Sequence, residues 1–169
     1  MLFKKIIEWV LKKISNKKYA KFIGVKFGDN CRFYTNYFGS EPYLIKIGND
    51  VTLTDGVKFI NHDGGVWVIR NKFEEYKNID IVKPITIGNN VFIGSNTIIL
   101  PGVNIGDDVI IAAGSIVTKN LDSGFVYKGI PAVKYISINE YIEKNCKYFE
   151  NTKGLSIIEK KNFYIGKKN

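Results

Sequence analysis

The sequence predicts an all-β fold, a parallel β-helix with an amphipathic helix before it and another helix after it. Two observations support this prediction. An aliphatic residue recurs every six positions, and a small or β-branched residue lies four positions after it. A period of six matches neither the 3.6 residues of a helical turn nor the alternation of a strand. The aliphatic residues that keep this register are Ile87, Ile93, Ile99, Ile105, Ile111 and Val117.

Each group of six residues, or hexad, supplies one short strand and one corner of the predicted β-helix. Its aliphatic side chain points inward, and the next position is often Gly because it lies at the corner. Three faces close one coil of about 18 residues, so stacked coils bury a column of Ile and Val. The phase begins weakly at Phe27 and returns at Ile47, which gives a predicted β-helix over residues 23–135. A β-sandwich, the alternative, would alternate every two residues between its turns.

The repeat is interrupted between Phe59 and Ile87, which predicts a loop inserted at about residues 61–83. Loops that project from a rigid scaffold commonly carry function. The loop begins Asn-His-Asp-Gly-Gly and holds the only histidine of the chain, His62. A lone histidine is more often structural, but an unperturbed imidazole, with a pKa of about 6.5, suits a general base at neutral pH. We therefore take His62 as the candidate catalytic residue.

The stretch IGNNVFIGSNTIILPGVNIGDDVIIAAGSIVTKN, followed by GIPAVKY, resembles the hexapeptide-repeat acyltransferases, and among them the acetyl-CoA-dependent O-acetyltransferases of sugars and antibiotics. The resemblance implies a left-handed β-helix, a homotrimer with active sites in the grooves between subunits, and acetyl-CoA as the acyl donor. It implies acetyl transfer to a hydroxyl, which we assign to a sugar in surface polysaccharide or lipopolysaccharide biosynthesis. Serine, an antibiotic and the amine of an amino sugar stay open as acceptors. A noncatalytic scaffold, similar to γ-carbonic anhydrase-like proteins without metal, is the alternative from another class.

The same resemblance implies roles for individual residues. His62 is the expected general base. Asn61 or Asp63 either orients its ring or binds the acceptor, or else holds the turn. Trp67 either forms a wall of the acceptor site or packs against a neighbouring subunit. The residues that match family positions contacting coenzyme A are Ser95, Ala113, Thr118, Lys119 and Lys134, of which the two lysines would face phosphates. GIPAVKY departs from the family spacing because Val133 precedes Lys134.

The basic character of the chain belongs to its ends. Of the formal charge of +9, residues 1–26 carry +7 and residues 137–169 carry +3, which leaves the middle at −1. A nucleic-acid binder spreads basic residues over the face that follows the phosphates, so we expect no nucleic-acid partner. One His and two Cys far apart make neither a zinc site nor a disulfide framework, and we expect no metal.

Residues 1–22 form the predicted N-terminal segment, with an amphipathic helix over residues 2–18. Its apolar side includes Ile7, Val10 and Ile14, and lysines lie opposite. The helix either caps the open end of the β-helix or touches an anionic membrane surface, where a lipid-linked sugar would be the acceptor. Residues 136–169 are predicted to hold a C-terminal helix and a tail. Without a signal peptide or membrane span, we expect a cytoplasmic protein, with the inner face of the membrane as a further possibility.

Overall fold

The computed structural model describes residues 2–167. Met1, Lys168 and Asn169, which the predicted terminal segments include, lie outside the described residues. The chain divides into two units, Met1–Ile138 and Asn139–Asn169.

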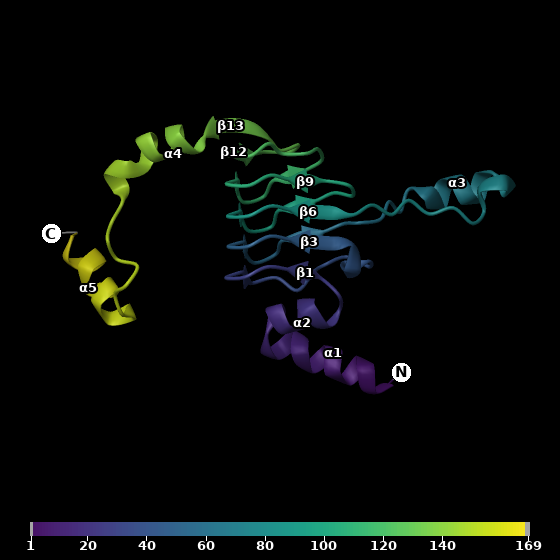
Figure 1. Ribbon diagram of the computed structural model, residues 1–169, viewed down its shortest axis with the longest axis horizontal. Coiled ribbons are helices and arrows are strands. Elements are labelled where there is room, and N and C mark those ends of the chain that lie inside the picture. The colour runs from purple at the N-terminus through teal and green to yellow at the C-terminus, as the bar shows by residue number, and fades with distance from the viewer. Residues whose placement is uncertain (1, 168–169) are drawn as a thin grey trace. The chain divides into compact units, whose positions relative to one another are not determined.

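The body of the first unit is built from three sheets of short strands that stack in parallel (Figure 1). The first sheet contains β1 (Lys26–Phe27), β3 (Ile45–Ile47), β6 (Ile85–Ile87) and β9 (Asn104–Ile105). The second sheet contains β2 (Arg32–Phe33), β4 (Thr52–Leu53), β7 (Phe92–Ile93), β10 (Ile110–Ile111), β12 (Phe125–Lys128) and the antiparallel β13 (Val133–Ser137). The third sheet contains β5 (Lys58–Phe59), β8 (Ile98–Ile99) and β11 (Ile116–Val117).

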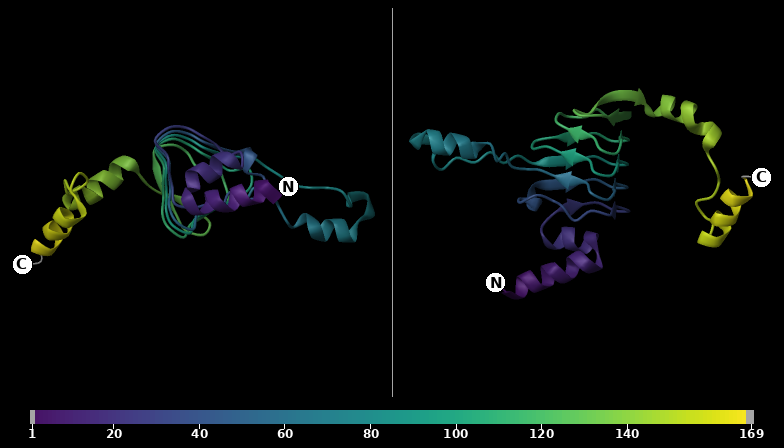
Figure 2. Two further views of the ribbon diagram at one scale, coloured as in Figure 1. Left: turned by 90° about the horizontal axis from the view of Figure 1, so that it is seen from below. Right: turned by 180° about the vertical axis from the view of Figure 1, so that it is seen from behind.

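From β3 to β11 the chain visits the first, second and third sheets in turn and then begins the next coil. Ile87 pairs with Ile105, which lies three hexads further along the chain, as the repeat predicts. Ile47 pairs with Ile87, well beyond three hexads, so the coil between them contains additional residues. Figure 2 shows the coils superimposed when the molecule is seen along the stack. The predicted parallel β arrangement is therefore confirmed, with helices added around it.

The interior of the stack holds the residues that the hexad pattern selects. The six aliphatic residues of the repeat are all buried, and so are the residues four positions later. Two of these later residues are polar, and each satisfies its hydroxyl locally: Thr97 donates to the Gly94 carbonyl and Ser115 to the Ala112 carbonyl, both at 2.7 Å. A buried hydroxyl is tolerated when it is hydrogen-bonded, which explains why Thr and Ser can replace Val here.

The corner between the first and second sheets is held by a ladder of side chains. The Asn89 carboxamide oxygen accepts from the backbone N–H of Asn49 at 2.9 Å, and the Asp107 carboxylate accepts from that of Asn89 at 2.6 Å. Each side chain thus fixes the turn of the coil before it. Gly88 is required beside this ladder, because an added Cβ would lie 2.8 Å from the carbonyl carbon of Gly106.

The N-terminal segment forms two helices, α1 (Leu2–Ile14) and α2 (Asn16–Phe22), where the sequence predicted one through residue 18. Ser15 separates them because its backbone is extended and its hydroxyl accepts from the backbone N–H of Lys18 at 3.3 Å, which caps α2. Tyr19 and Ala20 are buried in the same apolar cluster as Val25. The helix pair therefore covers the first coil. Within residues 2–167, no helix combines the length and apolarity that a membrane span requires.

The additional residues of the second coil lie between β5 and β6 and form a segment that projects from the stack (Figures 1 and 2). The sequence predicted a loop, but the segment contains α3 (Val66–Lys72) and η2 (Glu74–Tyr76). Its two ends pair as a short antiparallel stem. The Asn61 carbonyl accepts from the N–H of Lys83, and the N–H of Asp63 donates to the Ile81 carbonyl, both at 2.8 Å.

The second unit contains two helices where the sequence predicted one: α4 (Ile138–Asn145), which begins at the boundary, and α5 (Ile157–Gly166), with η3 (Cys146–Tyr148) between them. A capping box starts α5, because the Ser156 hydroxyl accepts from the Glu159 N–H and the Glu159 carboxylate accepts from the Ser156 N–H. Hydrogen bonds to the Glu159 carboxylate, first from the Ser156 side chain and then from its backbone, lower the pKa of that carboxyl.

Candidate active site

His62 lies at the root of the projecting segment, where the stem leaves the third sheet. Its backbone forms a bridge to Val82, between the two stem bonds described above. The side chain reaches back to the loop before β3, which includes η1 (Pro42–Leu44). Nδ1 of His62 lies 2.7 Å from the Ser40 hydroxyl and 3.6 Å from the Glu41 carboxylate. The Ser40 hydroxyl donates to the same carboxylate at 2.7 Å.

This chain of three side chains sets the tautomer of the histidine. A serine hydroxyl has one hydrogen, and Ser40 donates it to Glu41. Ser40 can therefore only accept from His62, so Nδ1 carries the ring hydrogen and Nε2 keeps its lone pair. The ring can then take a proton at Nε2, and the Glu41 carboxylate stands close enough to stabilise the resulting cation.

Asn61 is fully buried, and its side chain holds the backbone of the Ser40–Glu41 loop. Its amide nitrogen donates to the Glu41 carbonyl at 2.5 Å, and its oxygen accepts from the Glu41 N–H at 3.4 Å. Gly39 is required beside it, because its φ is +68° and an added Cβ would lie 2.4 Å from the Asn61 oxygen. With no exposed surface, Asn61 positions the loop that contacts His62.

Asp63 and Trp67 lie beyond His62 in the projecting segment. The Asp63 carboxylate accepts from the backbone N–H of Gly65 at 2.8 Å, so the structure shows the turn-holding alternative for this residue. Trp67 stands on α3 with 65% of its surface exposed. It does not line the hollow onto which His62 opens.

That hollow, which we call the His62 hollow, has a volume of about 320 Å³ and lies between the N-terminal helices and the first two coils. Its apolar part includes Phe38 and Phe59, whose rings stack with centroids 5.6 Å apart. A hollow with an apolar lining and a few polar groups is typical of a ligand site. The residues that line it are Lys12, Tyr19, Asn36, Tyr37, Phe38, Gly39, Ser40, Phe59, Ile60 and His62.

The candidate donor residues lie at the two edges of the third sheet. Backbone bonds from Ile60 to Ile99 and from Leu100 to Val117 continue the stacking past the strands. Thr118 and Lys119, which follow β11, therefore stand at the same edge as His62, which follows β5. Ser95 and Ala113 follow β7 and β10 at the other edge, where the Ser95 carbonyl accepts from the Gly114 N–H at 2.8 Å.

These edges leave room for an extended molecule. Ala113, Thr118 and Lys119 are exposed, and Lys119 forms no ion pair with a carboxylate within residues 2–167. The spacing of the coils here depends on small residues, since a Cβ added to Gly94 would lie 2.4 Å from the Ala113 nitrogen. The unpaired Lys119 and the small side chains would suit an acyl donor such as acetyl-CoA, which is held mainly by backbone groups and ends in phosphates.

Lys134 lies apart from the other four donor candidates. Its Nζ is 3.0 Å from the Asp122 carboxylate and 3.8 Å from the centroid of the Phe125 ring. Its charge is thus paired at the corner before β12 in this structure.

The described part of the chain contains no group of three or more His, Cys, Asp or Glu residues that could hold a metal ion. Cys31 is buried and Cys146 is exposed, and both are free thiols.

Residues 84–119 match the family described as the hexapeptide repeat of succinyl-transferase. Protein CapG of Staphylococcus aureus is 47% identical over 167 residues, which cover 97% of this chain and 95% of CapG. This chain belongs to the hexapeptide-repeat acyltransferases. Its relatives and structural neighbours within the family show that it is an acetyl-CoA-dependent O-acetyltransferase.

Two solved structures share the architecture of this hexapeptide-repeat acyltransferase. A maltose O-acetyltransferase from Clostridium difficile 630 has a TM-score of 0.61 at 24% identity, over 80% of this chain and 84% of that one. A galactoside acetyltransferase in complex with coenzyme A has a TM-score of 0.54 at 28% identity, over 89% and 85%. The maltose O-acetyltransferase shows the fold of this chain, and the galactoside acetyltransferase is a relative with coenzyme A bound.

Sequence reasoning missed Ser40 and Glu41, which complete the surroundings of His62 in this hexapeptide-repeat acyltransferase. The sequence held one weak signal: Phe27 and Ile47 are two positions further apart than three hexads, which would end at Ile45. The structure pairs Phe27 with Ile47. The longer first coil marks an enlarged corner, but it does not indicate which side chain faces the histidine.

Proposed function

We propose that this protein transfers the acetyl group of acetyl-CoA to a sugar hydroxyl in surface polysaccharide or lipopolysaccharide biosynthesis. The observation that carries the proposal is the chain from Glu41 through Ser40 to His62, which leaves Nε2 unprotonated beside an open hollow. The galactoside and maltose acetyltransferases similar to this chain act, by their names, on sugars.

In the proposed reaction His62 is the general base. Its Nε2 takes the proton of the acceptor hydroxyl while the oxygen attacks the thioester carbonyl. Ser40 holds the Nδ1–H, and the Glu41 carboxylate stabilises the imidazolium. When the tetrahedral intermediate collapses, the carbon–sulfur bond breaks and His62 returns the proton to the departing thiolate of coenzyme A. The products are an acetyl ester and free coenzyme A.

The donor is proposed to lie along the edges of the third sheet. Ser95, Ala113 and Thr118 supply small contacts and backbone groups, and the unpaired Lys119 faces the nucleotide phosphates. This arrangement brings the donor to the edge where His62 stands.

The stack is proposed to close as a left-handed β-helix and to assemble as a homotrimer. The projecting segment supports the trimer, because its α3 exposes 65% of Trp67 and 64% of Val68. Large apolar side chains exposed together on a protruding segment favour contact with another protein surface. In a trimer, α3 would pack against the neighbouring copy and complete the walls of the acceptor site.

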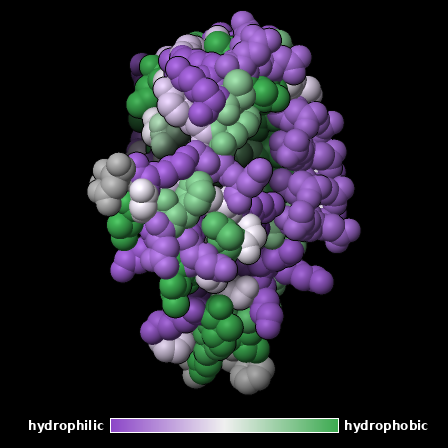
Figure 3. Space-filling model, turned by 90° about the vertical axis from the view of Figure 1, so that its left-hand side faces the viewer, coloured by the Kyte–Doolittle hydropathy of each residue, from purple (hydrophilic) through white to green (hydrophobic). Residues whose placement is uncertain are grey.

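The helix α1 is proposed to touch an anionic membrane surface at the cytoplasmic face. Ile6, Trp9 and Ile14 are exposed on it, and Lys13 lies 4.1 Å from the Trp9 ring centroid. Figure 3 shows hydrophobic side chains at the surface at the end of the first unit where α1 lies. An interfacial helix combines such apolar residues with lysines.

An acceptor screen tests the proposed function. Acetyl-CoA is mixed with sugars, an amino sugar, serine and a macrolide, and release of the coenzyme A thiol is measured for the wild type and for His62→Ala. We expect a sugar hydroxyl to be acetylated fastest, and turnover to fall by roughly 10²–10⁴-fold in the variant, the contribution of a positioned general base. Thermal unfolding of both proteins checks that the variant is folded. Faster transfer to serine or an amine would exclude the sugar hydroxyl, and equal turnover would exclude the base.

A further inference from the structure

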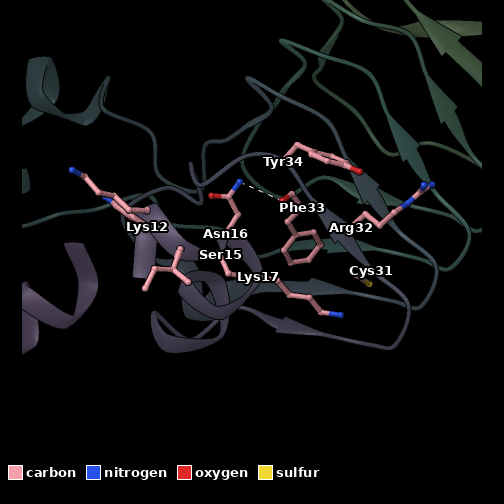
Figure 4. Close-up of a pocket in the computed structure, with 10 residues that line it drawn as sticks. Lys12, Ser15, Asn16, Lys17, Cys31, Arg32, Phe33 and Tyr34 are labelled. Atoms are coloured by element: carbon pink, nitrogen blue, oxygen red, sulfur yellow. Dashed lines mark hydrogen bonds between the residues drawn. The ribbon is translucent and has the colours of Figure 1, made fainter. Parts of the chain in front are cut away.

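A second hollow, which we call the basic hollow, lies between the N-terminal helices and the first coil. Its volume is about 450 Å³, within the range of small-molecule sites. Figure 4 shows Lys12 and Lys17 on the helices and Arg32 and Tyr34 on the β2 segment, with the charged ends of Lys17 and Arg32 on the same side and the Lys12 ammonium pointing away from them. The residues that line it are Lys12, Lys13, Ile14, Ser15, Asn16, Lys17, Cys31, Arg32, Phe33 and Tyr34.

The lining of the basic hollow includes four cations and no acidic residue. None of the four forms an ion pair with a carboxylate among the residues that the structure describes. Lys12 and Lys17 instead lie over aromatic rings, 4.9 and 5.5 Å from the centroids of Tyr19 and Phe27. Arg32 donates from Nε to the Thr52 hydroxyl at 3.1 Å. The positive charge is therefore not neutralised within the described chain, and a bound anion would neutralise it.

The basic hollow continues toward the catalytic histidine. Lys12 lines both the basic hollow and the His62 hollow. A smaller hollow of about 190 Å³ adjoins both along the first coil, because it shares Tyr34 with the basic hollow and Tyr37 with the His62 hollow. The basic hollow and the His62 hollow are therefore neighbours on the surface of the first unit.

We propose that the basic hollow binds a diphosphate group of the acceptor, so that the acceptor is a sugar linked through a diphosphate ester. This inference rests on the proposed function, because the sugar would reach His62. A diphosphate carries more negative charge than a carboxylate and therefore neutralises more of these cations. Arg32 presents a planar fork of donors that fits phosphate oxygens, and the lysines add point charges. A nucleoside diphosphate and a polyprenyl diphosphate share this chemistry.

The first test measures anion binding without turnover. Inorganic pyrophosphate is titrated calorimetrically into the wild type and into the double variant Lys17→Gln, Arg32→Gln. The matched control is Lys18→Gln, Lys21→Gln, which removes the same charge from exposed residues of α2 that do not line the hollow. We expect the dissociation constant to rise about tenfold or more in the first variant and to stay near the wild-type value in the control. Equal affinity in all three proteins would overturn the proposal.

The second test compares acceptors. A neutral methyl glycoside is compared with the same sugar linked to a nucleoside diphosphate and to a polyprenyl diphosphate in detergent micelles. We expect wild type to prefer a diphosphate ester, and Lys17→Gln, Arg32→Gln to lose about tenfold in kcat/KM for it while the methyl glycoside is unaffected. The preferred ester identifies the source of the diphosphate. Equal use of ester and glycoside by the wild type would overturn the proposal.

Three further outcomes distinguish a failure of the proposed function from a failure of the diphosphate site. If no sugar is acetylated while pyrophosphate still binds in the basic hollow, the proposed function and the acceptor assignment both fail, and only an anion site is left. If the double variant loses sedimentation with phosphatidylglycerol vesicles but keeps its affinity for pyrophosphate, the cations serve a lipid surface and the inference is wrong. Retained vesicle binding with lost pyrophosphate affinity supports it.

Discussion

The Ser40 hydroxyl lies 2.7 Å from Nδ1 of His62, although the two residues are 22 positions apart and belong to successive coils. The orientation of the proposed base therefore depends on the coil beneath it. The same loop carries Glu41, and buried Asn61 fastens that loop to the histidine's own backbone. A base whose Nδ1 is held by a fixed loop keeps its tautomer without contact from the acceptor.

Replacing Ser40 tests this dependence. Ser40→Ala removes the acceptor of the Nδ1 hydrogen bond, and we expect kcat to fall about tenfold, the effect of one hydrogen bond, with the KM for acetyl-CoA unchanged. Ser40→Thr keeps the hydroxyl and should retain most of the activity. Steady-state kinetics measures both. If Ser40→Ala kept the wild-type kcat, the hydroxyl would have no part in orienting the ring.

Asn61 should affect both stability and rate. Asn61→Ala leaves the Glu41 backbone groups without their partner, so we expect the free energy of unfolding to fall by about 1–3 kcal/mol and kcat to fall as well. Urea denaturation and steady-state kinetics measure the two effects. Asp63→Ala is the matched control, since it removes only an exposed turn bond. A loss of stability without any loss of kcat would show that the loop position does not matter for catalysis.

Lys119 and Lys134 should behave differently toward the donor. We expect Lys119→Ala to raise the dissociation constant of coenzyme A about three- to tenfold, because an unpaired exposed cation is lost at the donor edge. Lys134→Ala should leave it unchanged, because that charge is paired with Asp122. Neither change should alter stability much, as exposed ion pairs contribute little. Calorimetric titration decides, and the reverse order of effects would move the phosphate site to β13.

The oligomeric state is testable directly. We expect sedimentation equilibrium to give three times the chain mass of 19.2 kDa at micromolar concentration. Trp67→Asp should weaken the trimer and lower activity together, because the exposed tryptophan would meet the neighbouring copy. Lys72→Asp, an exposed change on the same helix, is the control. A fully active monomer would contradict a shared active site.

The hexad period was enough to predict the stacked sheets and the buried column from Ile87 to Val117, because that information is local and repeats. The break in the period and the single histidine were enough to select His62. The family resemblance of the last coils, and not the residue types alone, indicated Ser95, Ala113, Thr118 and Lys119 as candidates for the donor site.

Contacts between coils could not be predicted, because they depend on how far each corner extends. The longer first coil, in which Phe27 pairs with Ile47, places Ser40 and Glu41 against His62, and a shift in this register would turn a different side chain toward it. Burial then decided that Asn61 serves the loop, and an ion pair drew Lys134 to Asp122. Ser15, by ending α1, sets α2 over the first coil, and only this packing gathers Lys12, Lys17 and Arg32 around one hollow. The repeat determined the scaffold; the register between coils and the docking of the helices decided which side chains meet.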